Sequence, residues 1–308
     1  MGIMFPARTA KAAASVAIAA TLLISSAAEG DDPLTPITEL VIYGIDSDTA
    51  ELMRYVFSND TFFRIGVVRD QNGFVIDHPE CLSYVPGGDN KGFYSSPMGK
   101  DGTGGPKNVL AKINGLTAEA FMYSMPFTYK GMRGMTSVYD PIAGEWILLG
   151  IAHNNKDAKL VTFDLDTGEQ SLVMDLDDAW GAPAFEGLSA HPDPDKLYVM
   201  TGWKLGELDR TTGVITDVAN HTAHARIEAL EIAFGDDGPA IEVPGVDPSW
   251  TQDGALFAFS NTTDDLLVYN PDGGLTTYPS TFSTVDCEGV VFMTTLKDPF
   301  MKVFAQFD

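Results

Sequence analysis

Short apolar runs of about five residues, several with strict alternation of apolar and polar positions, follow one another from residue 40 onward. Examples are Leu160–Phe163, Leu197–Met200 and Ala255–Phe259. Runs of this length, rich in β-branched and aromatic residues and bounded by Gly, Asp and Asn, are typical of β-strands. Beyond the N-terminal segment no stretch has a sustained apolar period of 3.6 residues. The pattern therefore predicts an all-β protein.

A five-residue turn motif recurs between these runs. Each copy opens with Asp or Asn, has Thr or Gly three positions later, and closes on Ala or Gly. The copies are Asp46–Ala50, Asn114–Ala118, Asp164–Gly168, Asp209–Gly213 and Asn270–Gly274. Asp and Asn side chains bond to backbone amides a few residues downstream, and Gly accepts a left-handed backbone, so each copy predicts a hairpin turn.

A second motif alternates with the turns and opens with a charged residue, Glu in four copies and Arg in one. The copies are Glu80–Tyr84, Arg133–Ser137, Glu186–Ala190, Glu228–Ile232 and Glu288–Phe292. A further strand follows each copy, the first at Gly92–Ser95 and the last at Lys302–Ala305. The repeat unit is thus four strands in about 40–60 residues, a length typical of β-propeller blades.

We therefore predict an all-β, five-bladed β-propeller with four-stranded antiparallel blades. The first turn precedes the first charged motif, and the last charged motif follows the last turn. The N-terminus should then supply two outer strands of the last blade and the C-terminus two inner ones, which closes the ring and removes exposed sheet edges. The alternative, chance repetition in a two-sheet sandwich, does not require two motifs to alternate at five places.

The run Glu186–Pro192, the strand at Leu197–Val199 and the Thr-Gly turns after Asp164 and Asp209 resemble the repeats of secreted bacterial propeller proteins. The resemblance covers nearly all of residues 39–308 and implies the fold, but such propellers bind, scaffold or catalyse. The ring with carboxylates at matching strand starts also resembles the calcium-activated nucleotidase (apyrase) architecture. In that family, acidic and hydroxyl side chains converge on a central calcium, and Arg133 departs from this pattern.

The N-terminal segment reads as an export signal. Residues 1–28 contain Arg8 and Lys11 and no acid, then an apolar run at Ala12–Ile24, then small residues at Ser25–Ala28. This order is typical of a secretory signal peptide, and the apolar run is too short to span a membrane. We expect a signal peptide at 1–28, a linker at 29–38 and a single propeller domain at 39–308, in a secreted or periplasmic protein.

Charge limits the classes of partner. The 308 residues contain 43 acidic and 19 basic side chains, a formal net charge of −24. Nucleic acids and anionic membrane surfaces need clustered Lys and Arg, so we expect neither as a partner after signal cleavage. An unknown small molecule, glycan or protein remains as the partner, and we expect a monomer.

The charged residues that open the second motif form the candidate metal site. If the repeats are in register, Glu80, Arg133, Glu186, Glu228 and Glu288 lie at one height around the central channel. Carboxylates held that close do not all ionise without a counter-charge. Either Ca²⁺, which prefers carboxylate and water oxygens, binds the four Glu residues, or the ring is a structural plug in which Arg133 bridges two of them.

The loops that lead into these strands should surround one mouth of the channel. They carry the candidate ligand-binding residues, which are His78, Lys130, Trp180, His224, Arg226 and Asp286. A His beside carboxylates can act as a general base near neutral pH, and the alternative is that these loop residues are only solvated.

Cys81 and Cys287 are the only cysteines, and each is adjacent to the Glu of its motif copy. Their blades would be neighbours across the closing point of the ring. Export permits a disulfide there, and two buried thiols are the alternative.

We expect an exported propeller that acts as a ligand-binding or interaction module at the channel mouth, with or without a channel Ca²⁺. A calcium-dependent hydrolase of nucleotides or lactones at the same mouth, and a structural extracellular protein, are the alternatives. The sequence leaves open whether the chain is an enzyme, because no nucleophile motif such as Gly-x-Ser-x-Gly occurs.

Overall fold

The computed structural model describes residues 40–100, 106–154, 157–176, 180, 185–221, 227–233, 243–260, 265–270, 274–278 and 287–294. The chain divides into two compact units, Met1–Ile37 and Thr38–Asp308, and every described residue belongs to the second. The signal peptide (1–28) and the linker (29–38) fall outside the described residues and stay predictions. Within the described ranges, no helix has the length and apolar character needed to cross a membrane.

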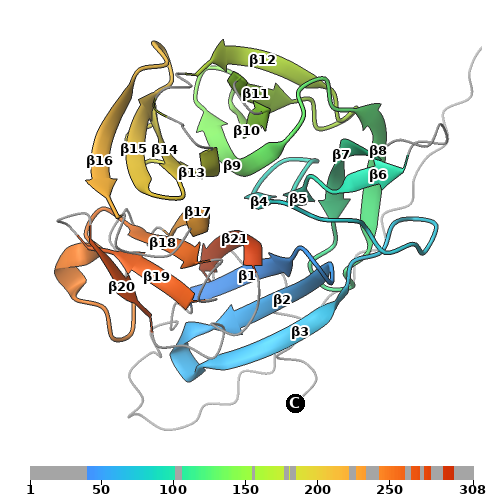
Figure 1. Ribbon diagram of the computed structural model, residues 1–308. Coiled ribbons are helices and arrows are strands. Elements are labelled where there is room, and N and C mark those ends of the chain that lie inside the picture. The colour runs from blue at the N-terminus through green and yellow to red at the C-terminus, as the bar shows by residue number, and fades with distance from the viewer. Residues whose placement is uncertain are drawn as a thin grey trace, which may run out of the picture. The chain divides into compact units, whose positions relative to one another are not determined.

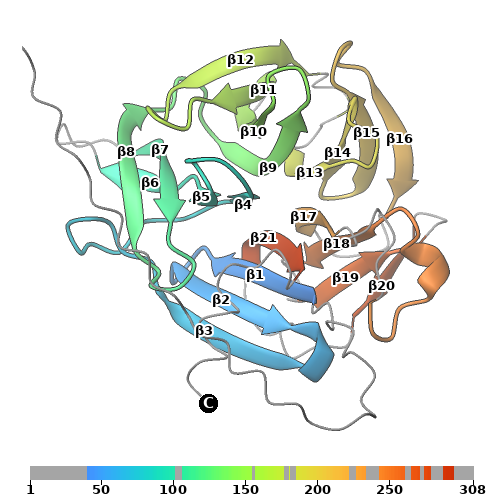
Figure 2. The ribbon, with the colours of Figure 1, turned by 180° about the vertical axis from the view of Figure 1, so that it is seen from behind.

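Five antiparallel sheets surround a common centre (Figures 1 and 2). From the centre outward, the first blade contains β4 (Leu82–Val85), β5 (Gly92–Ser95), β7 (Pro106–Ile113) and β8 (Ala120–Pro126). The second contains β9 (Met132–Asp140), β10 (Glu145–Asn154), β11 (Asp157–Phe163) and β12 (Gln170–Asp175). The third contains β13 (Phe185–Ala190), β14 (Lys196–Thr201), β15 (Lys204–Asp209) and β16 (Ile215–Asn220). The fourth contains β17 (Ile227–Ala233), β18 (Ala255–Ser260), β19 (Asp265–Tyr269) and β20 (Leu275–Thr277).

The fifth blade closes the ring with strands from both ends of the described chain. Its order from the centre outward is β21 (Cys287–Thr294), β1 (Leu40–Asp46), β2 (Glu51–Val56) and β3 (Thr61–Val67). The only helical segments among the described residues are two short 3-10 turns, η1 (Phe57–Asn59) and η2 (Pro248–Trp250). The chain is a five-bladed β-propeller.

The composition of the closing blade corrects one prediction. We expected two strands from each terminus, whereas three come from the N-terminal side and one, β21, from the C-terminal side. In Figure 1 the red β21 lies beside the blue β1, and the ladder pairs Val41 with Met293 and Ile45 with Gly289. β3, which we did not predict, is the outer strand. The strand expected at Lys302–Ala305 lies outside the described residues, and β1 takes the place that we assigned to it.

The cause of this error is the position of the first turn. Four of the five turn motifs join the third and fourth strands of a blade, as Asp164–Gly168 does between β11 and β12. Asp46–Ala50 instead joins β1 and β2, which are the second and third strands. The same turn also occurs where we did not predict it, at Asp140–Gly144 between β9 and β10, with Asp140 Oδ1 accepting bonds from two backbone amides. The turn therefore recurs without marking one fixed connection.

The first blade has an additional short strand, β6 (Met98–Lys100), which is a continuation of β5. Ser95 pairs with Ala111 of β7 and Met98 pairs with Asn108, so β5 and β6 follow the same register along β7. Pro97 interrupts the strand because it has no backbone N–H to donate to the ladder. The blade is thus four-stranded with a divided second strand.

The hydrophobic core lies between the blades. Five clusters of buried side chains each join two adjacent sheets, and the one between the first and second blades includes Tyr94, Met135 and Phe163. Each sheet buries both faces, which accounts for the nearly continuous apolar runs in the inner strands. Loops at the ends of the blades are left to carry function on a rigid frame.

Candidate functional site

The charged residue of the second motif occupies the same backbone feature in four innermost strands. The ladder pairs Met132 with Ala152 and Gly134 with Ile151, so Arg133 is an extra residue without a paired partner. In the other three strands, the residues on either side of the Glu pair with the neighbouring strand, and the Glu itself has no paired partner. These residues are Glu186, Glu228 and Glu288. Such β-bulges redirect a side chain and are frequent beside functional sites. The motif therefore marks a repeated bulge.

In the first blade, Glu80 precedes β4 by two residues and thus lies just outside the ladder. The backbone of Arg133, Glu186, Glu228 and Glu288 thus lies in the first residues of an innermost strand, and that of Glu80 just precedes one. The side chains of Glu228 and Glu288 lie outside the described residues.

A small residue follows the charged residue in every innermost strand. These are Cys81, Gly134, Gly187, Ala229 and Gly289. A Cβ atom added to Gly187 would lie 3.0 Å from Leu230 Cβ of the next blade, and one on Gly289 would overlap the backbone nitrogen of Leu82. The small residues let adjacent innermost strands approach closely, a requirement that we did not recognise in the sequence.

These positions surround one small cavity at the hub, meaning the centre of the ring formed by β4, β9, β13, β17 and β21. Apolar residues one position further along the strands complete its wall, namely Leu82, Met135, Leu188, Leu230 and Val290. The cavity measures about 10 Å³, which is room for one water molecule at most. The predicted channel is therefore filled by side chains and backbone at this height.

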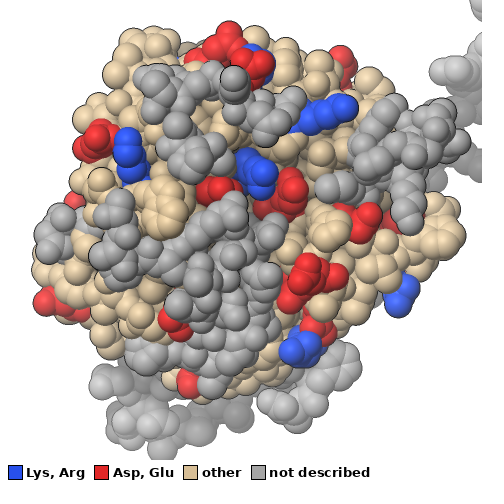
Figure 3. All heavy atoms as spheres, in the orientation of Figure 1, with Lys and Arg blue, Asp and Glu red and all other residues tan. Residues whose placement is uncertain are grey.

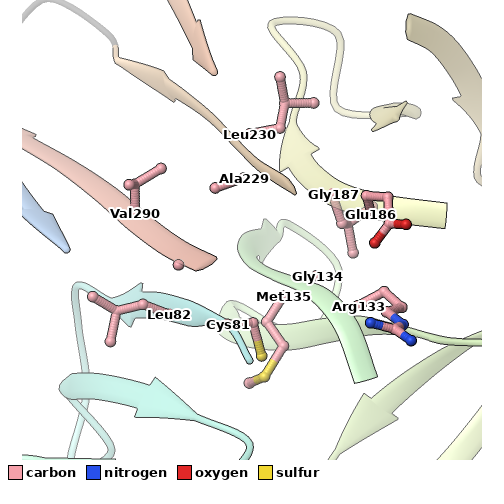
Figure 4. Close-up of a pocket in the computed structure, with 12 residues that line it drawn as sticks. Cys81, Leu82, Arg133, Gly134, Met135, Glu186, Gly187, Ala229, Leu230 and Val290 are labelled. Carbon is pink, nitrogen blue, oxygen red and sulfur yellow. The ribbon is translucent and has the colours of Figure 1, made fainter. Parts of the chain in front are cut away.

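Arg133 and Glu186 also line the hub cavity, and Figure 4 shows their charged ends on the same side of it. Glu186 is buried, and Arg133 is half-buried with its Nε atom lacking a hydrogen-bond partner among the described residues. In the space-filling view, basic and acidic side chains lie close together near the middle of the ring (Figure 3). The one basic residue of the motif and one of its acidic residues thus line the same side of the hub cavity.

The Ca²⁺ site stays a prediction. Within the described ranges, no group of three or more His, Cys, Asp or Glu side chains is arranged to hold a metal ion. Two of the four predicted ligands, Glu80 and Glu186, have described side chains, and Glu80 Oε2 is buried. Carboxylate oxygens are ligands that Ca²⁺ prefers, so Glu80 and Glu186 offer donors of the right chemistry for the ion.

Three of the predicted mouth residues are described. His78 and Lys130 are exposed, and His78 has a left-handed backbone with φ 42°. Trp180 is buried between the second and third blades, where its indole Nε1 donates a 2.6 Å hydrogen bond to Asp217 Oδ1. The three residues precede β4, β9 and β13 in the chain, and their part in ligand binding stays a prediction. His224, Arg226 and Asp286 lie outside the described residues.

The cysteine prediction is also open. Cys81 is buried, with its Sγ atom 3.0 Å from Ser96 Oγ. The close approach of Gly289 to Leu82 confirms that the strands carrying the two cysteines are neighbours in the ring. The side chain of Cys287 lies outside the described residues, so the disulfide stays a prediction.

Comparison with known proteins finds only distant likenesses to solved structures. No family model matches the sequence, and no curated protein matches it. A chain of a nidogen/laminin complex is 11% identical with a TM-score of 0.44, over 83% of this chain and 98% of that chain. A gluconolactonase from Xanthomonas campestris is 11% identical with a TM-score of 0.45, over 82% and 78%.

A streptogramin B lyase is 14% identical with a TM-score of 0.39, over 76% of this chain and 67% of that chain. These three proteins differ in what they do, and the likeness is too distant to transfer a site residue or an activity. Function must therefore be argued from the residues of this chain.

Proposed function

We propose that the protein is a ligand-binding or interaction module that uses the face of the ring where the innermost strands begin. The observation that supports this proposal is the bulge repeated at Arg133, Glu186, Glu228 and Glu288. A bulge interrupts a ladder that would otherwise be continuous and redirects a side chain, and in four blades it falls on a charged residue at the start of the innermost strand.

The closed hub supports a binding surface rather than a deep pocket. Among the described residues, the hub cavity of about 10 Å³ has no room for a ligand larger than water, and this favours binding by the face and its loops. Among the described loop residues, Lys130 and His78 are exposed and available for contact. The partner is a small molecule, a glycan or a protein.

We also propose that a Ca²⁺ ion balances the negative charge of the motif's glutamates, which are Glu80, Glu186, Glu228 and Glu288. A hard dication would neutralise carboxylates that otherwise repel one another, and would hold the loops that precede β4, β13, β17 and β21. Arg133 would then balance the remaining charge, beside Glu186.

The test is thermal unfolding of the full chain with a chelator and with excess Ca²⁺. Binding to the folded state alone stabilises it by about 2.7 kcal/mol at a hundredfold excess over the Kd, which is a shift of several degrees. We expect this shift in the wild type and not in Glu186→Gln.

Glu169→Gln is the matched control, because Glu169 is exposed on the turn between β11 and β12 and should leave the shift intact. An identical melting temperature with chelator and with Ca²⁺ removes the metal from the proposal. Calcium-dependent turnover of a nucleotide or a lactone would replace the binding module with the hydrolase.

A further inference from the structure

A groove of about 730 Å³ lies at the edge of the first blade, on residues that the hub does not use. Its walls come from the segment after β3, the start of β5 and the region where β7 turns into β8. The side chains used in the argument below are Arg69, Gln71, Lys91, Lys112, Asn114 and Phe121. This volume is within the range of sites that bind small ligands.

Backbone hydrogen bonds hold the walls of the groove together. Arg69 N donates to Ala118 O over 3.0 Å, and Ala120 N donates to Arg69 O over 2.7 Å. Gln71 Oε1 accepts a 3.0 Å bond from the backbone N–H of Met122. The segment after β3 is thereby attached to the neighbouring blade, so the groove exists before any ligand arrives and little ordering is needed on binding.

The basic side chains of the groove are more available than its acidic ones. Asp70 Oδ1 accepts bonds from the amides of Asn72 and Phe74, and Glu119 Oε2 accepts a 3.1 Å bond from the Thr117 hydroxyl. Both acids thus have local donors. The basic members, Arg69, Lys91 and Lys112, outnumber them.

Lys91 is exposed and forms no ion pair with any described residue. Lys112 Nζ donates to Asp89 O over 3.4 Å, which leaves further N–H groups for a ligand. Burial lowers the pKa of Lys112 while Asp166 and Asp89 act to raise it, and a carboxylate bound next to the ammonium group would raise it further. A surplus of basic groups is unusual in a chain with a net charge of −24.

An aromatic ring completes the groove. Phe121 is 56% exposed and lines the groove, so its ring offers an apolar surface to a ligand there. Its ring packs edge to face on Tyr123 with centroids 5.2 Å apart, and Tyr123 is in turn anchored by a 2.6 Å hydrogen bond to Leu165 O. The ring of Phe121 is therefore held in place while much of its surface stays accessible.

We propose that this groove binds a short acidic carbohydrate, one or two rings that carry a carboxylate. The apolar face of a sugar ring would pack on Phe121, the amide of Asn114 would bond to hydroxyl groups, and the basic groups would bind the carboxylate by charge-assisted hydrogen bonds. Arg69 donates one bond to Gly73 O over 3.1 Å and retains further donors for this purpose.

The experiment is calorimetric titration of the full chain with digalacturonate and, in parallel, with the uncharged digalactose and with sodium sulfate. We expect digalacturonate to bind at least tenfold more tightly than digalactose or sulfate. Raising the salt concentration from about 50 mM to about 500 mM should weaken it severalfold, because screening acts on the charged contacts.

Lys91→Gln and Phe121→Ala should each weaken binding of digalacturonate at least fivefold. Both side chains are exposed, so the variants should fold, and Arg210→Gln is the control with the same loss of charge on a distant blade. Equal affinity for digalactose, tighter binding of sulfate, no binding at all, or wild-type affinity in both groove variants would each overturn the proposal.

Discussion

Gly134 of β9 lies against the backbone of Leu188 in β13, so close that an added Cβ atom would be 2.5 Å from the Leu188 nitrogen. Real Cβ atoms do not approach a backbone atom this closely. The second and third blades therefore meet at the hub through main chain rather than through side chains. The same relationship joins Gly289 of β21 to Leu82 of β4 and thereby closes the ring.

This contact gives a graded prediction for the hub. Gly134→Ala and Gly289→Ala should each lower the free energy of unfolding by about 3 kcal/mol or more, because the obstacle is backbone and overpacking is costly. Gly187→Ala should cost less, about 1 kcal/mol, since its nearest neighbours include the flexible Met200 side chain at 3.0 Å. Chemical denaturation of the three variants measures the order. Equal losses would contradict the close approach of the backbones.

The turn motif offers a matched pair. Gly168 and Gly213 close equivalent turns with φ of 77° and 74°. Alanine at either position should lower the free energy of unfolding by about 1–2 kcal/mol, because its Cβ disfavours the left-handed backbone. Gly168→Ala should lower the free energy of unfolding by at least about 1 kcal/mol more. Its Cβ would lie 2.6 Å from Tyr123 Cβ, whereas the atom nearest to a Cβ at Gly213 is the Met174 sulfur at 3.2 Å. The midpoints of urea unfolding test this, and a larger loss in Gly213→Ala would refute it.

Glu231 of β17 predicts a pH dependence. It follows Ala229 and precedes Ala233 on the face of β17 that packs in the cluster between the fourth and closing blades. Burial raises the pKa of Glu231 well above its usual value, and its Oε2 atom is buried without a hydrogen-bond partner among the described residues. A carboxylate there is disfavoured in the charged form.

Because the folded pKa of Glu231 is raised, stability is greatest below the unfolded pKa and falls as the pH rises toward the folded pKa. Glu231→Gln does not ionise, so its melting temperature should exceed that of the wild type at neutral pH and approach it near pH 4. Melting curves across this range measure the difference. Glu169→Gln, at an exposed site, should have the melting temperature of the wild type at every pH. If Glu231→Gln loses stability with rising pH as the wild type does, groups other than Glu231 cause the pH dependence.

The single C-terminal strand of the closing blade predicts an all-or-none response to truncation. A chain that ends at Asp286 lacks β21, which pairs with β1 along seven residues of that strand. We expect the cooperative thermal transition to disappear for the whole domain, because the hub loses one of its five innermost strands. A chain that ends at Thr294 is the control, and circular dichroism follows both. A cooperative transition in the shorter chain would show that the other blades are stable without closure.

The sequence was sufficient for the number of blades and for the register of the innermost strands, because a charged residue recurs at each strand start. The sequence did not show how many strands each end of the chain contributes to the closing blade. A turn such as Asp46–Ala50 is stabilised locally, by the bond from Thr49 N to Asp46 Oδ1, and this bond is independent of which strands the turn joins. Only the long-range pairing of β1 with β21 shows that the N-terminal side supplies three strands of the closing blade and not two.

The candidate sites divide in the same way. Arg133 and Glu186 were identified from the repeat, since equivalent positions meet wherever the symmetry holds. The groove on the first blade was not, because Arg69, Lys91 and Phe121 come from three segments without a shared motif and are brought together by hydrogen bonds such as that between Arg69 N and Ala118 O. Such a site depends on a particular departure from symmetry, and a periodic pattern contains no information about it.

The place of β21 in the closing blade also bears on biosynthesis. During translation, β1, β2 and β3 are made before all the other blades, and β21, the partner of β1, is made only after those blades. Until then the inner edge of β1 presents unpaired amides and carbonyls to any other nascent strand. Ring closure therefore waits for the synthesis of the four other blades, and the inner edge of β1 is exposed to mispairing throughout that interval.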